Sequence, residues 1–359
     1  MAAYRGFRID ERDAQAMTDK VQTAADNALW SALREDGRLE CLLCPRHCRM
    51  KDGQRGFCFI RRNQGGKIVN TAYATSLGFQ IDPIEKKPLN HFYPGTTALS
   101  FGTAGCNLGC TFCQNWHLSR AKQVEESSAA VSPEAIAAAA KRHDCKSVAF
   151  TYNDPIIWAD YAMEVAQACR GRGVKTVAVS NGYMNPEPRR QFYAHMDAAN
   201  IDLKAFTEGF YRRYCLADLH TVLDTLVYIA KETSVWLEIT TLIIPGLNDD
   251  PQEMKQQSRW MVKELGEDIP LHLTAFHPTF RMTDREATPP ETLMKLRGIA
   301  VGEGLKYVYT GNVMSPETQS TYCPQCGEML IERHWHRIEI KGLQGCRCTK
   351  CGLNLAGRF

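Results

Sequence analysis

Three cysteines lie close together in the stretch "GTAGCNLGCTFCQNW" (residues 102–116). Cys106, Cys110 and Cys113 have the spacing C-x3-C-x2-C. Thiolates this close can ligate three irons of a [4Fe–4S] cubane, which leaves the fourth iron open to a ligand from outside the protein. We expect that ligand to be S-adenosylmethionine (SAM), because one electron passed from the reduced cluster to its sulfonium releases methionine and a 5′-deoxyadenosyl radical. An incomplete structural zinc site is the alternative.

A second cysteine group precedes this one in the sequence. It offers four potential ligands, Cys41, Cys44, Cys48 and Cys58. Zinc and an auxiliary iron–sulfur cluster both fit such a set of thiolates. The spacing does not decide between the two.

A third group lies near the C-terminus and consists of two C-x2-C pairs, Cys323 with Cys326 and Cys348 with Cys351. Four thiolates in this pattern predict a tetrahedral zinc site and a zinc-ribbon-like tail that folds around its metal. A rubredoxin-like iron site is the alternative. The neighbouring Cys346 is a surplus thiol that could replace Cys348.

Charge and composition limit the classes of partner. The 359 residues include 43 basic and 40 acidic side chains, a formal net charge of +3, which is too balanced to indicate a nucleic-acid or anionic membrane partner. No apolar run approaches the roughly 20 residues of a membrane helix. The polar N-terminus does not resemble a secretory signal. We expect a cytoplasmic protein whose 15 cysteines stay reduced, with the isolated Cys145, Cys169 and Cys215 buried and inert.

Strands alternating with helices must position the central cysteines. Seven short apolar strands are predicted, at residues 98–103, 147–152, 175–180, 198–204, 236–243, 271–276 and 306–311. This alternation indicates an α/β fold with parallel strands. Six or seven such units are too few for a full eight-fold barrel, so we expect a partial (β/α)6-type barrel. The cysteine triplet follows its first strand, at the carboxyl end where barrel active sites lie.

Three domains are predicted on this basis. Residues 1–95 would hold an N-terminal helix (10–36), a metal-ordered loop region (41–70) and an irregular connector (82–95). The barrel would span 96–315, and the zinc-ribbon-like domain 316–359.

Several helix starts are marked by the residues that precede them. Proline at the first helical position follows Ser132, Asp154 and Asn185. The sequences "DPQE" (250–253) and "TPPE" (288–291) fit the capping box.

Two predicted strands carry polar residues at alternating positions. In "NIDLK" the alternation places Asp202 and Lys204 on one face and Ile201 and Leu203 on the other. An acid and a lysine directed into a barrel are costly unless they are paired or bind a ligand. Glu238 and Thr240 share a face by the same rule, although a buried hydrogen-bonded pair would explain them equally well.

Several motifs carry a family resemblance that spans nearly the whole chain. "CNLGCTFC", "TYNDP" (151–155), "SNGY" (180–183), "IDLKAF" (201–206), "IPGLNDD" (244–250) and "FHP" (276–278) resemble the radical SAM superfamily, in its pyruvate formate-lyase activating enzyme branch. "CLLCPRHC", "DPIEKKPLNHFYPG", "CTFCQNW", "YTGN" and the C-terminal knuckles resemble the AmmeMemoRadiSam-system radical SAM enzymes. The resemblance implies a radical SAM barrel, an oxygen-sensitive cluster and a one-electron donor of the flavodoxin or ferredoxin type. It also implies Memo-like and AMMECR-like partner proteins.

The resemblance further implies which residues contact SAM. The candidates are Phe112, Asn153, Asp154, Ser180, Asn181, Asp202, Lys204 and His277. Four of them have another explanation open to them: Asp154 as a helix cap, Ser180 and Asn181 as a turn, and His277 as a structural histidine.

Three functions follow from these observations. The leading one is a SAM-cleaving enzyme whose radical abstracts hydrogen from an unidentified substrate. The second is an activase for a glycyl-radical enzyme. The third is a non-catalytic, metal-stapled scaffold that binds protein or nucleic acid.

Overall fold

The computed structural model describes residues 29–121, 130–334 and 337–359. The described chain divides into two compact units whose segments alternate along the sequence. The first unit comprises residues up to Asp82, then Thr97–Gly109 and Cys113–Asp197. The second comprises Pro83–Thr96, Cys110–Phe112 and Ala198–Phe359.

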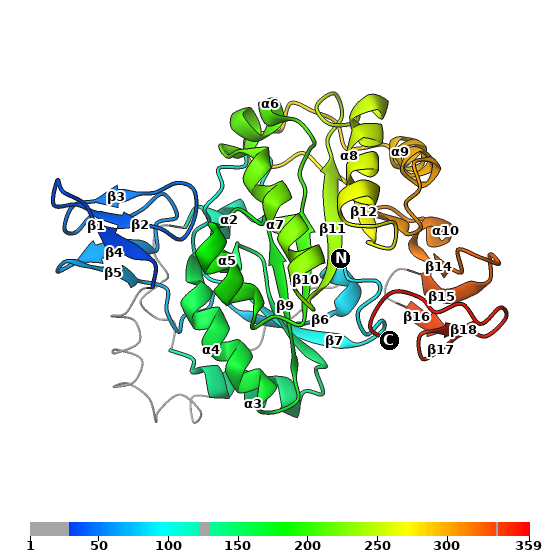
Figure 1. Cartoon of the computed structure of the whole chain (residues 1–359), viewed down its shortest axis with the longest axis horizontal. Helices are drawn as coiled ribbons and strands as arrows, with labels where there is room; N and C mark the ends of the chain where they lie inside the picture. The colour runs from blue at the N-terminus through cyan, green and yellow to red at the C-terminus, as the bar shows by residue number, and fades with distance from the viewer. Residues whose placement is uncertain (1–28, 122–129, 335–336) are drawn as a thin grey trace. The chain divides into compact units, whose positions relative to one another are not determined.

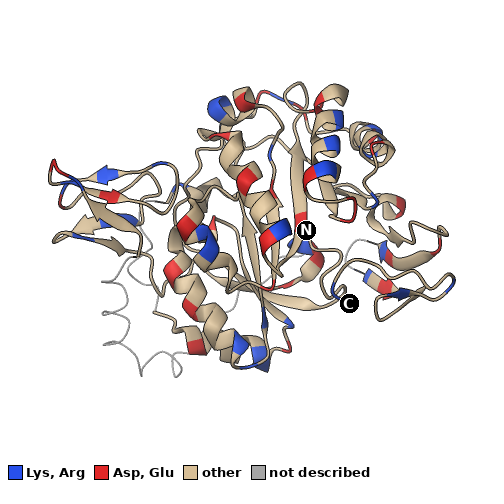
Figure 2. Cartoon of the chain, in the orientation of Figure 1, with Lys and Arg blue, Asp and Glu red and all other residues tan. Residues whose placement is uncertain are grey.

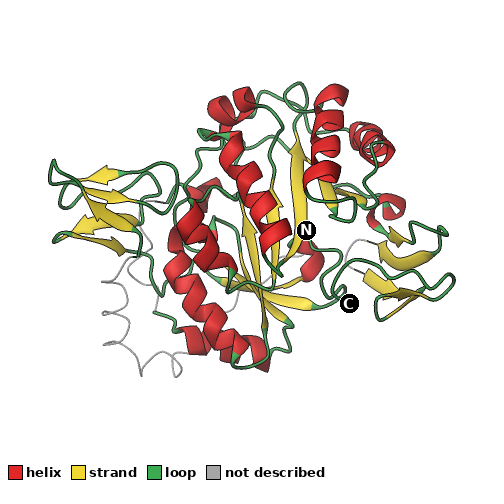
Figure 3. Ribbon diagram, viewed as in Figure 1, coloured by secondary structure: helices red, strands yellow, loops and turns green. Residues whose placement is uncertain are grey.

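The first unit begins with two small antiparallel sheets, drawn as strands and loops in Figure 3. The elements are β1 (Ser31–Leu33), β2 (Leu39–Cys41) and β3 (Arg49–Met50) in one sheet, and β4 (Arg61–Gln64) and β5 (Lys67–Asn70) in the other. Thus Cys41 ends a strand, and Cys44, Cys48 and Cys58 lie in the turns between strands. The predicted loop region is therefore wrong in part, because the tight turn at Gly65 and Gly66, both with positive φ, lets β4 and β5 pair as a hairpin.

The rest of the first unit is a layer of strands with helices packed on it. The strands are β6 (Phe79–Pro83, whose last residue belongs to the second unit), β7 (Thr97–Phe101), β8 (Ser147–Phe150) and β9 (Lys175–Ser180); β8 is parallel to β7 and β9. The helices are α2 (Trp116–Ser119), α3 (Pro133–Arg142), the 3-10 turn η3 (Pro155–Trp158), α4 (Ala159–Arg170) and α5 (Pro186–Tyr193). Helix α3 packs against α4 (Figure 1). Edge-to-face and tilted rings of Phe101, Phe150, Trp158 and Tyr161 fill the core beneath these helices.

The second unit continues the alternation. Its strands β10 (Ala198–Asp202), β11 (Trp236–Ile243), β12 (Leu271–Ala275) and β13 (Val308–Gly311) pair in parallel, in that order. Its helical elements are η2 (Ile84–Lys86), α6 (Glu208–Phe210), the π-turn η4 (Tyr211–Cys215), α7 (Leu219–Glu232), α8 (Pro251–Glu264) and α9 (Pro290–Gly302). Acidic and basic side chains are mixed along α8 (Figure 2), as the balanced composition predicts.

The tail of the second unit is built from short elements. They are α10 (Pro316–Gln319), β14 (Thr321–Tyr322), β15 (Met329–His334), β16 (Arg337–Ile340), β17 (Leu343–Gln344) and β18 (Arg347–Cys348). Buried Leu330, Ile331 and Leu355 pack with the tail cysteines into a small core. Such a core is small, and a metal held by the four cysteines would add to its stability.

The predicted strands and most helix starts are confirmed. Asp154 caps η3 by accepting the Ile156 N–H at 3.0 Å, and Ser132 caps α3 by accepting the Ala135 N–H at 3.1 Å. Asn185 precedes α5, but its side chain instead donates to the Leu42 carbonyl at 2.7 Å.

The helix predicted over 10–36 lies mostly outside the described residues, and only its end from residue 29 is described, where it forms a bend and β1 instead of helix. The capping box closes at neither predicted site. The Glu253 carboxylate turns to the Phe206 N–H at 2.6 Å, and Thr288 donates to the Ile243 carbonyl at 2.5 Å. Tertiary partners therefore outcompete the local reciprocal bond.

None of the helices in the described part of the chain has the length and hydrophobicity needed to cross a bilayer.

Candidate functional site

The loop that carries Cys106 begins where β7 ends. Gly105, just before Cys106, has φ of +83°, and a Cβ there would lie 2.0 Å from the Cys58 carbonyl oxygen. Only glycine fits this close approach. The loop backbone is therefore packed tightly against the Cys58 segment.

Asn153 holds this loop from the end of β8. Its Oδ1 accepts the Thr103 N–H at 3.0 Å, and its Nδ2 donates to the Ala104 and Gly105 carbonyls at 3.1 and 2.9 Å and to Thr103 Oγ1 at 3.2 Å. Asn153 is only 6% exposed. Its amide is thus committed to the cysteine loop, a role that the TYNDP motif alone did not reveal.

Asp154 and Ser180 link the ends of two neighbouring strands. The Asp154 carboxylate accepts the Ser180 hydroxyl at 3.2 Å and the Asn181 N–H at 2.7 Å. The Asn181 amide in turn donates to Asn107 Oδ1 at 2.8 Å and approaches Cys106 Sγ at 3.9 Å. The candidates around β8 and β9 therefore form one buried network that reaches the first cysteine.

Two thiols of the triplet lie in the first unit and are partly exposed. The Leu108 N–H points at Cys106 Sγ over 3.5 Å, and Cys113 Sγ lies 3.3 Å from the Ser119 hydroxyl. Donors placed at sulfur stabilise the thiolate form that an iron requires. The sulfur chemistry and surroundings of this loop fit a thiolate-bound cluster.

Cys110 and Phe112 belong to the second unit, together with Asp202 and Lys204. Cys110 is buried, and a hydrogen bond with Cys215, together with burial, raises the pKa of its thiol well above the usual range, against the opposing effect of Lys204. Cys215 was predicted to be inert. Its sequence position gave no signal of this contact, because the two residues are more than 100 positions apart.

Asp202 and Lys204 form an ion pair of 2.9 Å, and the neighbouring Ile201 and Leu203 are fully buried. The predicted alternation of faces is confirmed. Burial acts to lower the pKa of Lys204, but the Asp202 carboxylate and the nearby thiols raise it well above its usual value, so the side chain is charged. The Lys204 ammonium also lies 6.0 Å from the centre of the Phe112 ring. Four candidate residues of the second unit therefore lie close together around a partly exposed ion pair. They are Cys110, Phe112, Asp202 and Lys204.

His277 is exposed and lies two residues after the end of β12. Glu238 is fully buried and lies at the amino end of β11. Glu238 accepts four hydrogen bonds of 2.7–2.9 Å, from the Asn90 and His91 main chain and from the Trp236 and His272 rings. Burial acts to raise its pKa, but these donors lower it below the usual value. Thr240 donates instead to Asn200 Oδ1 at 2.9 Å.

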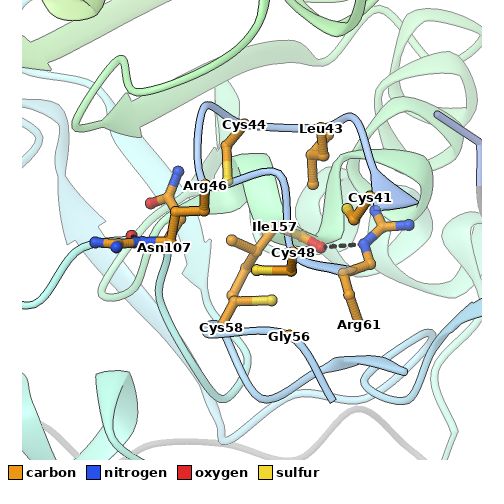
Figure 4. A pocket seen from close by; sticks show the side chains of 10 residues that line it. All are labelled: Cys41, Leu43, Cys44, Arg46, Cys48, Gly56, Cys58, Arg61, Asn107 and Ile157. Carbon is orange, nitrogen blue, oxygen red and sulfur yellow. Dashed lines mark hydrogen bonds between the residues drawn. The ribbon is translucent and has the colours of Figure 1, made fainter. Parts of the chain in front are cut away.

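The N-terminal cysteines line one cavity in the first unit, shown in Figure 4. Cys41, Cys44 and Cys58 are buried and Cys48 is partly exposed. Burial raises the pKa of the Cys41 thiol to about 11, so a cation is needed to hold it as a thiolate.

The C-terminal cysteines converge as predicted. The Sγ atoms of Cys323, Cys326, Cys348 and Cys351 all lie within 4.8 Å of one another. Main-chain N–H groups of Cys351 and Lys350 lower the pKa of the Cys348 thiol to about 7. Cys346 is exposed and lies outside the group, 3.8 Å from Asn354, so Cys348 and not Cys346 lies with the other three thiols. The four thiols can hold a single metal ion.

Comparison with known proteins gives one relative that matches over most of its length and one that matches over part of it. The chain is 40% identical over 320 residues to an uncharacterised protein of Methanocaldococcus jannaschii, a match that covers 89% of this chain and 95% of that protein. It is 23% identical over 150 residues to the (2S)-3-sulfopropanediol dehydratase activating enzyme of Klebsiella oxytoca, covering 41% of this chain and 46% of that enzyme.

Solved structures also resemble the chain. A radical SAM methyltransferase from Sphaerobacter thermophilus aligns with a TM-score of 0.49 and 13% identity, covering 86% of this chain and 85% of that one. A domain of the pyruvate-formate lyase-activating enzyme from Bacteroides vulgatus aligns with a TM-score of 0.41 and 17% identity, covering 46% of this chain and 99% of that one.

A family model for the radical SAM superfamily matches residues 101–257, which begin at the last residue of β7 and contain the cysteine triplet and both polar networks around it. The radical SAM resemblance drawn from the motifs and the α/β fold predicted from the alternation are both confirmed by this match and by the parallel strands. The chain contains a domain of the radical SAM superfamily within residues 101–257.

Proposed function

We propose that this protein cleaves SAM reductively on a [4Fe–4S] cluster held by Cys106, Cys110 and Cys113. The observation that carries the proposal is the three-cysteine loop at the carboxyl end of β7, inside the region that matches the superfamily. The cluster would supply one electron to the sulfonium of SAM, which yields methionine and a 5′-deoxyadenosyl radical that takes hydrogen from the substrate.

The chain's own residues would shape and charge this site. Asn153 fixes the loop, and the Asp154 network ties it to β9. Asp202 and Lys204 offer an anion and a cation, which suit the amino and carboxylate groups of SAM. Phe112 offers an apolar ring beside them. Ser180, Asn181 and His277 remain candidate contacts.

The experiment is a product assay under anaerobic conditions. Reconstituted protein reduced with dithionite should form 5′-deoxyadenosine and methionine from SAM. Cys106→Ala, Cys110→Ala and Cys113→Ala should each abolish this reaction, whereas the exposed Cys346→Ala should not. Parental product formation by Cys113→Ala would contradict the ligand assignment.

A second candidate is an activase for a glycyl-radical enzyme. The similarity to the sulfopropanediol dehydratase activating enzyme favours it. Its test is a glycyl-radical EPR signal in a candidate partner protein after incubation with SAM and the reduced enzyme. A scaffold without catalysis would bind metals but form no 5′-deoxyadenosine in the product assay.

Partners and remaining metals are also part of the proposal. A flavodoxin- or ferredoxin-type protein would deliver the electron, and Memo-like and AMMECR-like proteins would act with the enzyme in the cytoplasm. Zinc is the proposed ion for the tail, because its four convergent thiols close a tetrahedron. The domain limits 1–95, 96–315 and 316–359 are proposed as the functional division.

A further inference from the structure

The four N-terminal cysteines lie around one small cavity, and all four line it (Figure 4). Backbone atoms assist at the rim, where the Phe57 N–H points at Cys48 Sγ over 3.4 Å. Four thiols that converge on one buried space are arranged to hold a metal centre.

The C-terminal group shows the sulfur–sulfur distances that a single metal ion requires. A tetrahedral Zn²⁺ with Zn–S bonds of about 2.3 Å needs sulfurs roughly 4 Å apart. The tail meets this condition, with Sγ distances of 3.5 Å between Cys323 and Cys351 and 3.7 Å between Cys326 and Cys348. Over residues 29–121, 130–334 and 337–359, the tail is the one group of three or more possible ligands whose atoms all approach within 4.8 Å. The N-terminal thiols are spread more widely, as they must be when each binds a different iron of a cubane.

A buried cation, Arg61, lies at the N-terminal site. Arg61 is 1% exposed, lines the cavity, and uses its Nε to donate to the Ile157 carbonyl at 2.8 Å. Its Nη1 lies 3.1 Å from an Asp160 oxygen, but neither Nη atom makes a hydrogen bond in the described part of the chain. A buried guanidinium with unused donors beside four thiols suits an anionic metal–thiolate centre, since four thiolates outweigh the charge of the metal core.

The cavity also adjoins the Cys106 loop. Asn107, the residue after Cys106, lines the cavity, and its carbonyl accepts a hydrogen bond from Arg46 Nε, another lining residue. Gly105, the residue before Cys106, packs directly on the Cys58 carbonyl. Both neighbours of a proposed ligand of the first cluster therefore touch the N-terminal site.

We propose that Cys41, Cys44, Cys48 and Cys58 hold a second [4Fe–4S] cluster with four protein ligands, and that this cluster passes electrons to the SAM-binding cluster. A reduced flavodoxin- or ferredoxin-type donor gives one electron and is oxidised, and the second cluster moves from its 2+ to its 1+ state. It returns to 2+ when the electron moves to the first cluster. The relay rests on the proposed function, whereas the presence of the cluster does not.

The experiment counts metals in variants of the full chain, prepared anaerobically. Wild type should hold about eight irons, about eight sulfides and about one zinc. The triple variant Cys106→Ala/Cys110→Ala/Cys113→Ala should keep about four irons and four sulfides, with a reduced EPR signal that SAM does not change. A triple variant with no iron and about two zincs would overturn the proposal.

The complementary variant is Cys41→Ala/Cys44→Ala, with Cys346→Ala as a matched cysteine control. It should lose about four irons, keep the SAM-sensitive signal, and lose at least tenfold in SAM cleavage driven by a protein donor while keeping cleavage driven by dithionite. Equal loss with both reductants would overturn the relay. If this variant does not fold, the triple variant alone decides whether the second cluster exists. Failure of SAM cleavage in wild type that holds eight irons would refute the proposed function and leave the second cluster standing.

Discussion

Replacing Asn153 by aspartate distinguishes two possible roles of this side chain: holding the cysteine loop and contacting SAM directly. Asn153 donates from Nδ2 to the Ala104 and Gly105 carbonyls and to Thr103 Oγ1, and it accepts from the Thr103 N–H through Oδ1. Aspartate keeps the acceptor but presents an oxygen to two carbonyls. If Asn153 holds the cysteine loop, Asn153→Asp should disorder it.

The expected loss of loop stability in Asn153→Asp follows from these contacts. The two hydrogens of Nδ2 are shared among these three acceptors, so at about 1 kcal/mol each their loss amounts to about 2 kcal/mol, before any repulsion between the new carboxylate and the carbonyl oxygens. Since about 1.4 kcal/mol is a factor of ten, the ratio of ordered to disordered loop should fall more than 10-fold.

The assay is iron and sulfide per chain after anaerobic reconstitution, together with SAM affinity. Asn153→Asp should lose most of the SAM-binding cluster, whereas the exposed amide-to-acid control Gln64→Glu should keep it. A direct SAM contact through Oδ1 would give the opposite result, because a carboxylate would hold the methionyl ammonium at least as well. Full cluster content with unchanged or tighter SAM binding in Asn153→Asp would refute the loop-holding role.

Four further predictions concern charge, burial and metals. Asp202→Ala should weaken SAM binding about 10- to 100-fold in anaerobic calorimetry, because a hydrogen bond to a charged group is lost; unchanged affinity would remove it from the site. Burial lowers the pKa of His91 to about 4, so between pH 6.5 and 4 the unfolded chain binds a proton that the folded chain does not. Stability should therefore fall by about 3 kcal/mol as pH drops through this range, and urea unfolding of His91→Gln should lack this component; equal pH slopes would contradict it. Glu238→Gln should lower the free energy of unfolding in the same assay by about 3–5 kcal/mol, because it leaves buried donors unpaired. The exposed control Glu232→Gln should lower it by less than about 0.5 kcal/mol, and similar effects of the two variants would contradict the buried network. Cys323→Ala should remove the tail metal and expose the tail to proteolysis while leaving iron content unchanged, and a loss of iron would show that the tail supports the cluster loop.

The strands were predictable because each buried strand appears in the sequence as a short run of apolar residues. Each of the seven predicted strands is present within a few residues, since a parallel strand covered on both faces reads as a short apolar run. The strand β6 was missed, because "FQIDP" has a charge, a proline and no apolar run. The capping boxes failed because Glu253 and Thr288 have tertiary partners that no local pattern encodes.

The site was predictable where ligands are close in sequence. C-x2-C spacing identified the tail group, and the structure brings those thiols together. The buried chain of contacts from Arg333 through Thr321 and Tyr309 to His91 was missed. Its members come from distant segments, and single histidines or arginines in a sequence give no sign of whether they are buried.

The hydrogen bonds around His91 explain why its ring stays neutral. Its Nδ1 lies 2.8 Å from the Ala356 carbonyl, which can only accept, so Nδ1 carries the proton. Its Nε2 then accepts from the Tyr309 hydroxyl at 2.6 Å. A second proton on the ring would reverse that bond and place a charge in a dry interior.

The central claim is that one iron of the cluster held by Cys106, Cys110 and Cys113 is open to SAM. The most direct measurement is EPR of the anaerobic, dithionite-reduced Cys41→Ala/Cys44→Ala variant before and after addition of SAM. We predict a [4Fe–4S] signal whose g-values shift when SAM binds. A signal that is unchanged by saturating SAM, or the lack of any cluster signal in a folded sample, would contradict the account.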